Sequence, residues 1–453
     1  MSPVPPEQDI TTNYDAVQRT DNTSKGEALL KNEKAVQIDG FVYDASSLAT
    51  IHPGGELFVK AFAGRNATEA FLSYHRREFP HDRYSKYLLS GADSKAERSK
   101  DPESDKDFLE LCRLVEQVLP RSKSFAPFHY YLKVFALLAL SIGLETYIHT
   151  TASYKWYLTG LQGFLFALIG LNIQHDANHG AISRYSIVNR ILGLSQNWIG
   201  GSAVDWIHQH VVQHHVNPNH THRDPDIVGN PLLRLNPLAS LEKHHLLQHI
   251  YMFILLALFG FTYILDSFLH NLKGFHFVKM SSLLTGNRLF EEATIVLFFL
   301  RWIALPLFQQ PSLVTLLNIA PLFMVGGYYL SFFFVISHNF EGVALFGPAQ
   351  QPVTAGGLKY DSFLHKQVVT ASNVGGSWLC FLNGGLNYQI EHHLFPRIQH
   401  SHYPTIAPVV REFCLSKGIP YVHFPTVLDN VASTIRHLQQ LGSTQFPAGY
   451  QAH

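Results

Sequence analysis

Apolar residues are gathered into long stretches in the middle of the chain, between residues 131 and 336. A membrane-spanning helix needs roughly 20 consecutive, mainly apolar residues. Five stretches come close to that length, at 131–148, 156–173, 246–269, 293–308 and 313–336. Short polar segments separate the first two and the last two, as in helical hairpins. The pattern predicts an all-α membrane body, which we place at residues 128–440.

The segments outside this body are polar. Residues 1–33 are rich in Pro, Ser, Thr, Asp and Asn, which predicts a disordered tail. Residues 34–94 predict a small α+β domain, because 37–44 alternates around a turn like a hairpin and helical stretches follow. Residues 95–127 predict a charged linker with a surface helix at 106–118, and 441–453 a flexible tail. No apolar run precedes residue 130, so we expect no cleaved presequence and a cytosolic N-terminal part.

The composition of the chain indicates which kinds of metal site and which partners are possible. Histidine occurs 27 times and cysteine only three times. Three scattered thiols are too few for a disulfide framework or a thiolate metal site, which indicates a reducing compartment and imidazole-based chemistry. The formal net charge is zero, so the sequence carries no nucleic-acid-binding footprint.

Three histidine clusters stand out against the apolar background. Histidines four residues apart lie on one face of a helix, so both imidazoles of such a pair point the same way. The clusters are His175 and His179; His210, His214 and His215; and Gln389 with His392 and His393; in addition, His338 ends the last apolar stretch. One metal ion uses about three to five imidazoles, so these eight histidines fit two ions better than one. All-imidazole sites suit zinc, copper, iron or nickel.

Other polar residues near the clusters receive lesser roles. Asp176 and Glu391 are expected to orient ligand imidazoles by accepting hydrogen bonds from them. Seven other histidines in or near the membrane body are expected to be solvated surface residues: His208, His220, His222, His244, His245, His249 and His270.

The clusters constrain how the chain crosses the membrane. The first two follow the second apolar stretch and the third follows the fifth, so an even number of the three later stretches must cross if all clusters share one site. The polar turn 309–312 joins 293–308 and 313–336 into a hairpin. The stretch 246–269, which contains His249 and Asp266, is therefore predicted to lie at the membrane interface. Four spans result, with both termini cytosolic.

A second kind of histidine site lies in the N-terminal domain. His52 begins the motif His-Pro-Gly-Gly-Glu, and His75 follows 23 residues later. Two imidazoles on opposite faces of a haem leave no open iron position, which favours electron transfer. Gly54 and Gly55 let the backbone approach the ring closely. The segment resembles a cytochrome b5 domain. A fused one-electron donor makes redox-inactive zinc pointless in the membrane body and favours iron with dioxygen.

Together, the fused haem domain, the three histidine boxes and the glutamine in Gln389-Ile390-Glu391-His392-His393 resemble the front-end fatty acyl desaturases, which are membrane di-iron enzymes. The resemblance implies heme b, two Fe ions, O2 as co-substrate, a polyunsaturated acyl-lipid or acyl-CoA substrate, NADH-cytochrome b5 reductase as electron donor and an endoplasmic reticulum membrane. It also implies the catalytic and iron-binding set His175, His179, His210, His214, His215, His338, His392 and His393, with Gln389 a ligand or near-ligand.

One departure from the family pattern leaves a ligand open. Three residues, Val211, Val212 and Gln213, separate the first two histidines of the middle box, where many members have two. Either His210 or His208 can then be the residue that reaches iron. The longer box looks most like those of algal and protist delta-4 and delta-5 enzymes, which insert a cis double bond on the carboxyl side of existing ones.

Alternatives remain open at this point. A delta-6 fatty acid or delta-8 sphingolipid desaturase shares the fusion and the glutamine box. An alkyl hydroxylase uses the same iron pair, and a non-enzymatic haem carrier with a structural metal has the same motifs. The sequence thus predicts a small α+β cytochrome b5-like domain, then an all-α membrane desaturase domain with four transmembrane helices and a cytosolic histidine-rich cap.

Overall fold

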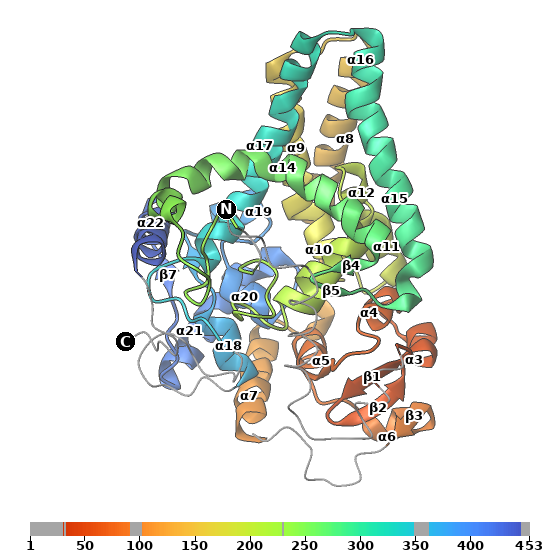
Figure 1. Ribbon diagram of the computed structural model, residues 1–453. Coiled ribbons are helices and arrows are strands. Elements are labelled where there is room, and N and C mark those ends of the chain that lie inside the picture. Colours follow the sequence, from red (N-terminus) through yellow and green to blue (C-terminus); the bar gives the residue numbers. More distant parts are fainter. Residues whose placement is uncertain (1–29, 31–32, 91–101, 229–230, 348–361, 445–453) are drawn as a thin grey trace.

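The computed structural model describes residues 30, 33–90, 102–228, 231–347 and 362–444 (Figure 1). Most of the two predicted tails and the first part of the predicted linker lie outside these residues. Within them, a small N-terminal domain lies against the lower part of a helical body, and several long helices run from there to the opposite end of the molecule.

The N-terminal domain is built on an antiparallel three-stranded sheet. Its strands β1 (Ala35–Ile38), β2 (Phe41–Asp44) and β3 (Leu88–Ser90) lie in that order. Asp39 and Gly40 both have positive φ, 51° and 80°, as a two-residue hairpin turn requires. The helices are α3 (Ala45–Ile51), α4 (Glu56–Ala61), α5 (Thr68–His75) and α6 (His81–Tyr84), followed by the 3-10 turn η2 (Ser85–Tyr87). The predicted hairpin and α+β fold are confirmed.

Helix α7 (Pro102–Val118) contains the predicted helix 106–118 and joins the two parts. Its apolar face, with Phe108, Leu111 and Val115, is fully buried. These side chains pack in one core with residues of α18 (Phe363–Val369), α20 (Gln389–Leu394) and α21 (Tyr403–Ser416). The helix is therefore an integral part of the C-terminal cap rather than a loose surface element.

Long helices form the membrane body. They are α8 (Phe128–Thr150); α9 (Trp156–Ile169), which continues through the π-helix η5 (Gly170–Gln174) into α10 (His175–Asn178); α14 (Gln248–Lys273); α15 (Thr285–Phe299), which continues through η9 (Leu300–Ala304) into α16 (Leu305–Gln309); and α17 (Leu313–His338). By length and composition, four helical segments of the described chain can cross a membrane: Arg121–Thr150, Trp156–Asn178, Lys243–Lys273 and Leu313–His338.

This set differs from the predicted one, since it contains α14 and omits α15–α16. The segment α15–α16 carries charged residues, and the fold pairs two of them, Glu291 and Arg301, with other groups of the protein. Arg301 binds both carboxylate oxygens of Glu145 on α8, at 2.8 and 3.0 Å. Glu291 is fully buried and accepts from the backbone N–H of Ala203 at 2.7 Å. Charges within a membrane are tolerated when they pair inside the protein in this way.

Helix α14 has a different setting from the other long helices. Figure 1 shows it lying across the bundle, whereas α8, α9, α15–α16 and α17 run together to the top of the view. One face carries an exposed apolar stripe that includes Ile250, Ile254 and Leu258, while Met252 and Leu256 on the other face are buried. Apolar residues therefore occupy both faces of α14, and its course across the bundle is the feature typical of a helix that lies in the membrane interface. The interfacial placement of 246–269 stays a prediction, and this geometry favours it.

Shorter elements close the structure around the lower end of the bundle. They are η4 (Arg121–Lys123), α11 (Ser186–Gly193), α12 (Ser195–Trp198), α13 (Ala203–Trp206), the π-helix η6 (Ile207–His214), η7 (Lys243–Leu247), β4 (Phe275–His276), β5 (Val278–Lys279), η8 (Ser282–Leu284), β6 (Asn373–Val374), α19 (Ser377–Asn383), η10 (His400–His402), β7 (His423–Phe424) and α22 (Val427–Ser443). Strands β6 and β7 pair in parallel and hold the end of the chain against the cap.

Candidate haem and metal sites

His52 and His75 face each other in the N-terminal domain. His52 is the C-cap of α3 and His75 is the last residue of α5, and their ring centroids are 5.9 Å apart. Each Nδ1 donates to a backbone carbonyl, that of Gly55 at 2.8 Å and that of Phe71 at 3.1 Å. The hydrogen bonds fix the tautomer that leaves Nε2 unprotonated, as axial ligation of haem iron requires.

The surroundings of this pair also suit a planar cofactor. Burial lowers the pKa of His52, and burial together with the charge of His52 lowers the pKa of His75 to about 3, so both are neutral near pH 7. Gly55 has a φ of +91°, and a Cβ on Gly54 would lie 2.9 Å from the His52 ring. Larger residues would fill or distort the space beside the ring.

The histidines of the three boxes converge in one buried centre. One group consists of His175, His179, His210 and His392, and the other of His214, His338 and His393; within each group the candidate ligand atoms lie within 4.8 Å of one another. His215 lies between the groups: its Nε2 is 3.1 Å from that of His210 and 3.0 Å from that of His392. Gln389 Nε2 lies 3.0 Å from His338 Nε2. Residues more than 200 positions apart thus meet at the lower ends of α9–α10 and α17.

An outer ring of protein groups orients these imidazoles. The Nδ1 partners are Tyr74 for His179 (2.6 Å), Asp224 for His214 (3.1 Å), the Thr370 carbonyl for His338 (2.9 Å), Tyr403 for His392 (3.3 Å) and Gln367 for His393 (2.9 Å). Each ring therefore turns its Nε2 inward. Metal-bound histidines characteristically use their second nitrogen in this way.

Buried nitrogens without partners mark the inner side of the centre. Both ring nitrogens of His175 and the Nε2 atoms of His179 and His214 have no hydrogen-bond partner, although all three side chains are buried. Leaving such atoms unpaired is costly, and metal ions bound on the Nε2 side would satisfy them. Two groups of imidazole nitrogens fit a pair of metal ions.

A π-helix accounts for the long middle box. In η6 the N–H of His215 donates to the carbonyl of His210, five residues earlier, at 2.9 Å. The wider turn accommodates the extra residue and brings His210 and His215 together. His208 points elsewhere, with its Nε2 3.1 Å from the Val278 carbonyl oxygen. The structure brings His210, not His208, into the centre. π-helical turns are frequent at functional sites.

Several expectations for other polar residues are wrong. His208, His220 and His245 are buried rather than solvated, while His244 is exposed as predicted and the other three are half-buried. His245 Nδ1 accepts from the Glu242 backbone at 2.9 Å, and His220 Nδ1 accepts from the His222 backbone at 3.2 Å. The cap folds over these segments and gives the rings local partners, so they escape water without joining the centre.

The expected roles of Asp176 and Glu391 are also wrong. Asp176 accepts from His400 Nδ1 at 2.6 Å. Glu391 accepts from Asn373 at 2.7 Å and Tyr421 at 2.8 Å, and burial raises its pKa to about 7. Side chains next to each other on a helix point in different directions, so these carboxylates face away from the neighbouring ligand rings.

Sequence reasoning missed the groups that do orient the centre, among them Asp224, Tyr74 and Gln367. No local pattern marks them, because each comes from a segment outside the boxes. A further cluster, in which Asp205 accepts from His270 and His276 at 3.3 and 3.1 Å, lies outside the centre. Its two imidazoles stack face to face at 3.7 Å, and the candidate ligand atoms of the three residues lie within 4.8 Å of one another.

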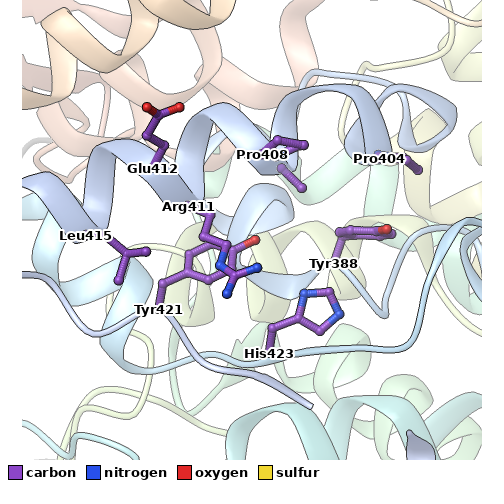
Figure 2. Close-up of a pocket in the computed structure, with 9 residues that line it drawn as sticks. Tyr388, Pro404, Pro408, Arg411, Glu412, Leu415, Tyr421 and His423 are labelled. Atoms are coloured by element: carbon purple, nitrogen blue, oxygen red, sulfur yellow. The ribbon is translucent and has the colours of Figure 1, made fainter. Parts of the chain in front are cut away.

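Two pockets among the described residues contain no histidine of the centre. Figure 2 shows a groove of about 430 Å³ between α21 and β7, with Arg411, Tyr388 and His423 around it. Tyr421 also lines it and connects it to Glu391. A second, apolar pocket of about 320 Å³, which Phe164 and Tyr328 help to line, lies among α9, α14 and α17. The centre itself is closed to bulk water.

Comparisons with known proteins agree with both sites. Residues 154–425 match the fatty acid desaturase family model, and residues 22–96 match the model of cytochrome b5-like haem/steroid-binding domains. The chain is 43% identical over 408 residues to an acyl-lipid (7-3)-desaturase of Rebecca salina, covering 88% of this chain and 89% of the relative. It is 44% identical to an acyl-lipid (7-3)-desaturase of Diacronema lutheri, covering 89% of both. It is also 30% identical to Delta(5) fatty acid desaturase A of Dictyostelium discoideum, covering 91% of both.

Proposed function

The chain belongs to the fatty acid desaturase family, as a membrane-bound front-end desaturase with a fused cytochrome b5-like domain, and we propose that it inserts its double bond at the delta-4 position of a polyunsaturated acyl chain. The main support is the identity of 43–44% to two (7-3)-desaturases, against 30% to an (8-3)-desaturase. A new bond three carbons to the carboxyl side of one at carbon 7 is a delta-4 bond.

We further propose that heme b binds between His52 and His75 and that two iron ions bind in the histidine centre. His175, His179, His210 and His392 would hold one ion and His214, His338 and His393 the other, with His215 between them. Iron held there supplies the dioxygen chemistry that removes two hydrogens from unactivated methylenes. The unpaired Nε2 atoms of the buried imidazoles support this assignment.

The protein's own contribution is a dry, oriented setting. Phe334 lies beside His175 and His210, with ring centroids at 6.3 and 5.6 Å, so an apolar wall adjoins the nitrogens. The pocket among α9, α14 and α17 is lined almost wholly by apolar and aromatic groups and offers space for an alkyl chain. Because polar contacts cannot distinguish one methylene from another, the distance from the anchored carboxyl end to the centre must select the position.

The proposal also covers the electron donor, the membrane in which the protein lies and the carrier of the acyl chain. Electrons reach the haem from an NADH-dependent cytochrome b5 reductase, one at a time, and pass to the histidine centre. The haem domain and the centre lie on the same side of the bundle, which supports a cytosolic orientation in the endoplasmic reticulum membrane. We propose that the acyl carrier is a lipid rather than coenzyme A, since the two (7-3) relatives are named acyl-lipid desaturases.

The regiochemistry is tested by feeding. Host cells that make no polyunsaturated fatty acids would express the chain and receive acids whose first double bond lies at carbon 7 or at carbon 8. We expect a product only from the first, with its new bond at carbon 4. Product only from the second, or a product whose new double bond lies at carbon 6 or carbon 8, would refute the proposal. His393→Ala serves as the inactive control.

The same cultures distinguish the other functions. A desaturase product is two hydrogens lighter than its substrate, whereas a hydroxylase product is one oxygen heavier, and mass spectrometry separates them. Metal analysis of the purified chain adds a second criterion. Non-haem iron at about two per chain, beside the one haem iron, supports the di-iron assignment, while zinc without dioxygen consumption would favour a haem carrier with a structural metal.

A further inference from the structure

Tyr74 lies at the contact between the haem domain and the histidine centre. It directly precedes His75 in α5, and its hydroxyl lies 2.6 Å from Nδ1 of His179. His75 is one of the two facing imidazoles of the haem domain, and His179 belongs to the first metal group. One residue therefore touches both redox sites, through the chain on one side and through a hydrogen bond on the other.

The contact is held in place by the surrounding interface. The Tyr74 ring packs on Phe58 at 5.7 Å, and Phe58 lies against Gly180, next to His179. Two polar contacts flank it: Lys366 of α18 pairs with Glu69 of α5 at 2.7 Å, and Arg76 donates to Ser124 at 3.1 Å. The hydroxyl thus meets His179 in a fixed geometry.

The chemistry of His179 gives this hydrogen bond a direction. Its Nε2 is buried, has no protein partner and points into the metal group. With Nε2 used as a ligand, the proton must sit on Nδ1, which then donates to the Tyr74 hydroxyl oxygen. The haem domain therefore sets the tautomer and ring angle of an imidazole in the other domain.

We propose that Tyr74 is a positioning residue that couples the two redox sites: its hydroxyl orients His179 and completes the bonded path from the haem ligand His75 to the histidine centre. The inference rests on the proposed function. Each transfer oxidises ferrous haem to ferric haem and adds one electron to the metal of the centre. No bond of Tyr74 forms or breaks, and it keeps its proton.

Tyr74→Phe tests this in the full-length, haem-loaded protein, because it removes the hydroxyl and keeps the ring. Tyr43→Phe is the matched control, since Tyr43 makes the same kind of bond, at 2.7 Å to His81 Nδ1, away from the interface. Two quantities are measured: the affinity and visible spectrum of cobalt(II) bound at the emptied histidine centre, and the rate at which dioxygen reoxidises the reduced haem of the iron-loaded protein.

We expect Tyr74→Phe to lower the cobalt affinity and the reoxidation rate by about 10–100-fold, the usual cost of losing an outer partner of a metal-bound histidine. Its haem spectrum should not change, and Tyr43→Phe should leave all three quantities at wild-type values. An unchanged reoxidation rate or an unchanged cobalt spectrum in Tyr74→Phe would overturn the inference.

Two further measurements keep the test decisive. If Tyr74→Phe binds no haem, Tyr74→Gln is used in its place, because the Gln amide oxygen can still accept from Nδ1 of His179. Wild-type cobalt affinity in Tyr74→Gln then supports the positioning role. A loss of cobalt affinity equal to that of Tyr74→Ala contradicts it. Failure of the proposed function is recognised separately, because the wild-type haem would then show no iron-dependent reoxidation.

Discussion

At the scale of single residues, five imidazoles of the centre are oriented by a hydrogen-bond partner on Nδ1. Asp224, which is fully buried, accepts from His214, and with Asp226 it outweighs the effect of burial and raises the pKa of His214 to about 9. We predict that Asp224→Asn weakens cobalt(II) binding at the centre by about 10–100-fold, measured by titration, because the neutral amide accepts a weaker hydrogen bond from Nδ1 than the carboxylate does and leaves the ring a weaker ligand. Asp205→Asn is the control, since Asp205 is a buried carboxylate that contacts two histidines outside the centre. Equal losses in both variants would show a general folding defect instead.

At the scale of elements, the centre depends on how closely α9 and α17 approach, because they carry His175 and His338 at their ends. A Cβ on Gly163 of α9 would lie 2.2 Å from the carbonyl oxygen of Leu322 on α17. Small residues permit such close helix contacts in membranes. We predict that Gly163→Ala destabilises the protein by about 1–3 kcal/mol, the usual cost of overpacking, and lowers its metal content. Thermal unfolding in detergent measures the first effect. Gly143→Ala on α8, where a Cβ meets nothing within 4 Å, should unfold at or above the wild-type temperature, and a similar loss there would contradict the packing argument.

At the scale of the whole molecule, the two proposed cofactor sites lie in separate domains, so we expect that each can be emptied without the other. We predict that His52→Ala abolishes the visible haem spectrum and the electron supply but leaves the metal content of the histidine centre unchanged. His393→Ala should keep the haem spectrum and lose metal. Absorbance spectra and metal analysis of the two purified variants test this reciprocity. Full activity of His52→Ala would mean that an external cytochrome delivers the electrons.

Features set by residues close together in the chain could be predicted from the sequence, whereas features set by contacts between distant segments could not. The boxes could be recognised because ligand pairs such as His175 and His179 are set by helical periodicity, which is local. The π-turn that brings His210 to His215 could not be predicted, because it depends on how η6 packs against the rest of the protein. The burial of His208 could not be predicted either, since the segment that covers it, at Val278, comes 70 residues later in the chain. Asp176 and Glu391 were assigned to neighbouring rings that they do not face.

The amino-acid sequence by itself determined the haem motif, the histidine boxes, the apolar stretches and the family, because each is encoded in short-range spacing and composition. Only the tertiary structure decided which histidines share a centre, which groups orient them and how α14 lies relative to the bundle. It alone brought Tyr74 to His179. These outcomes depend on contacts between segments far apart in the chain, and a local sequence pattern does not indicate which distant residue will make a given contact.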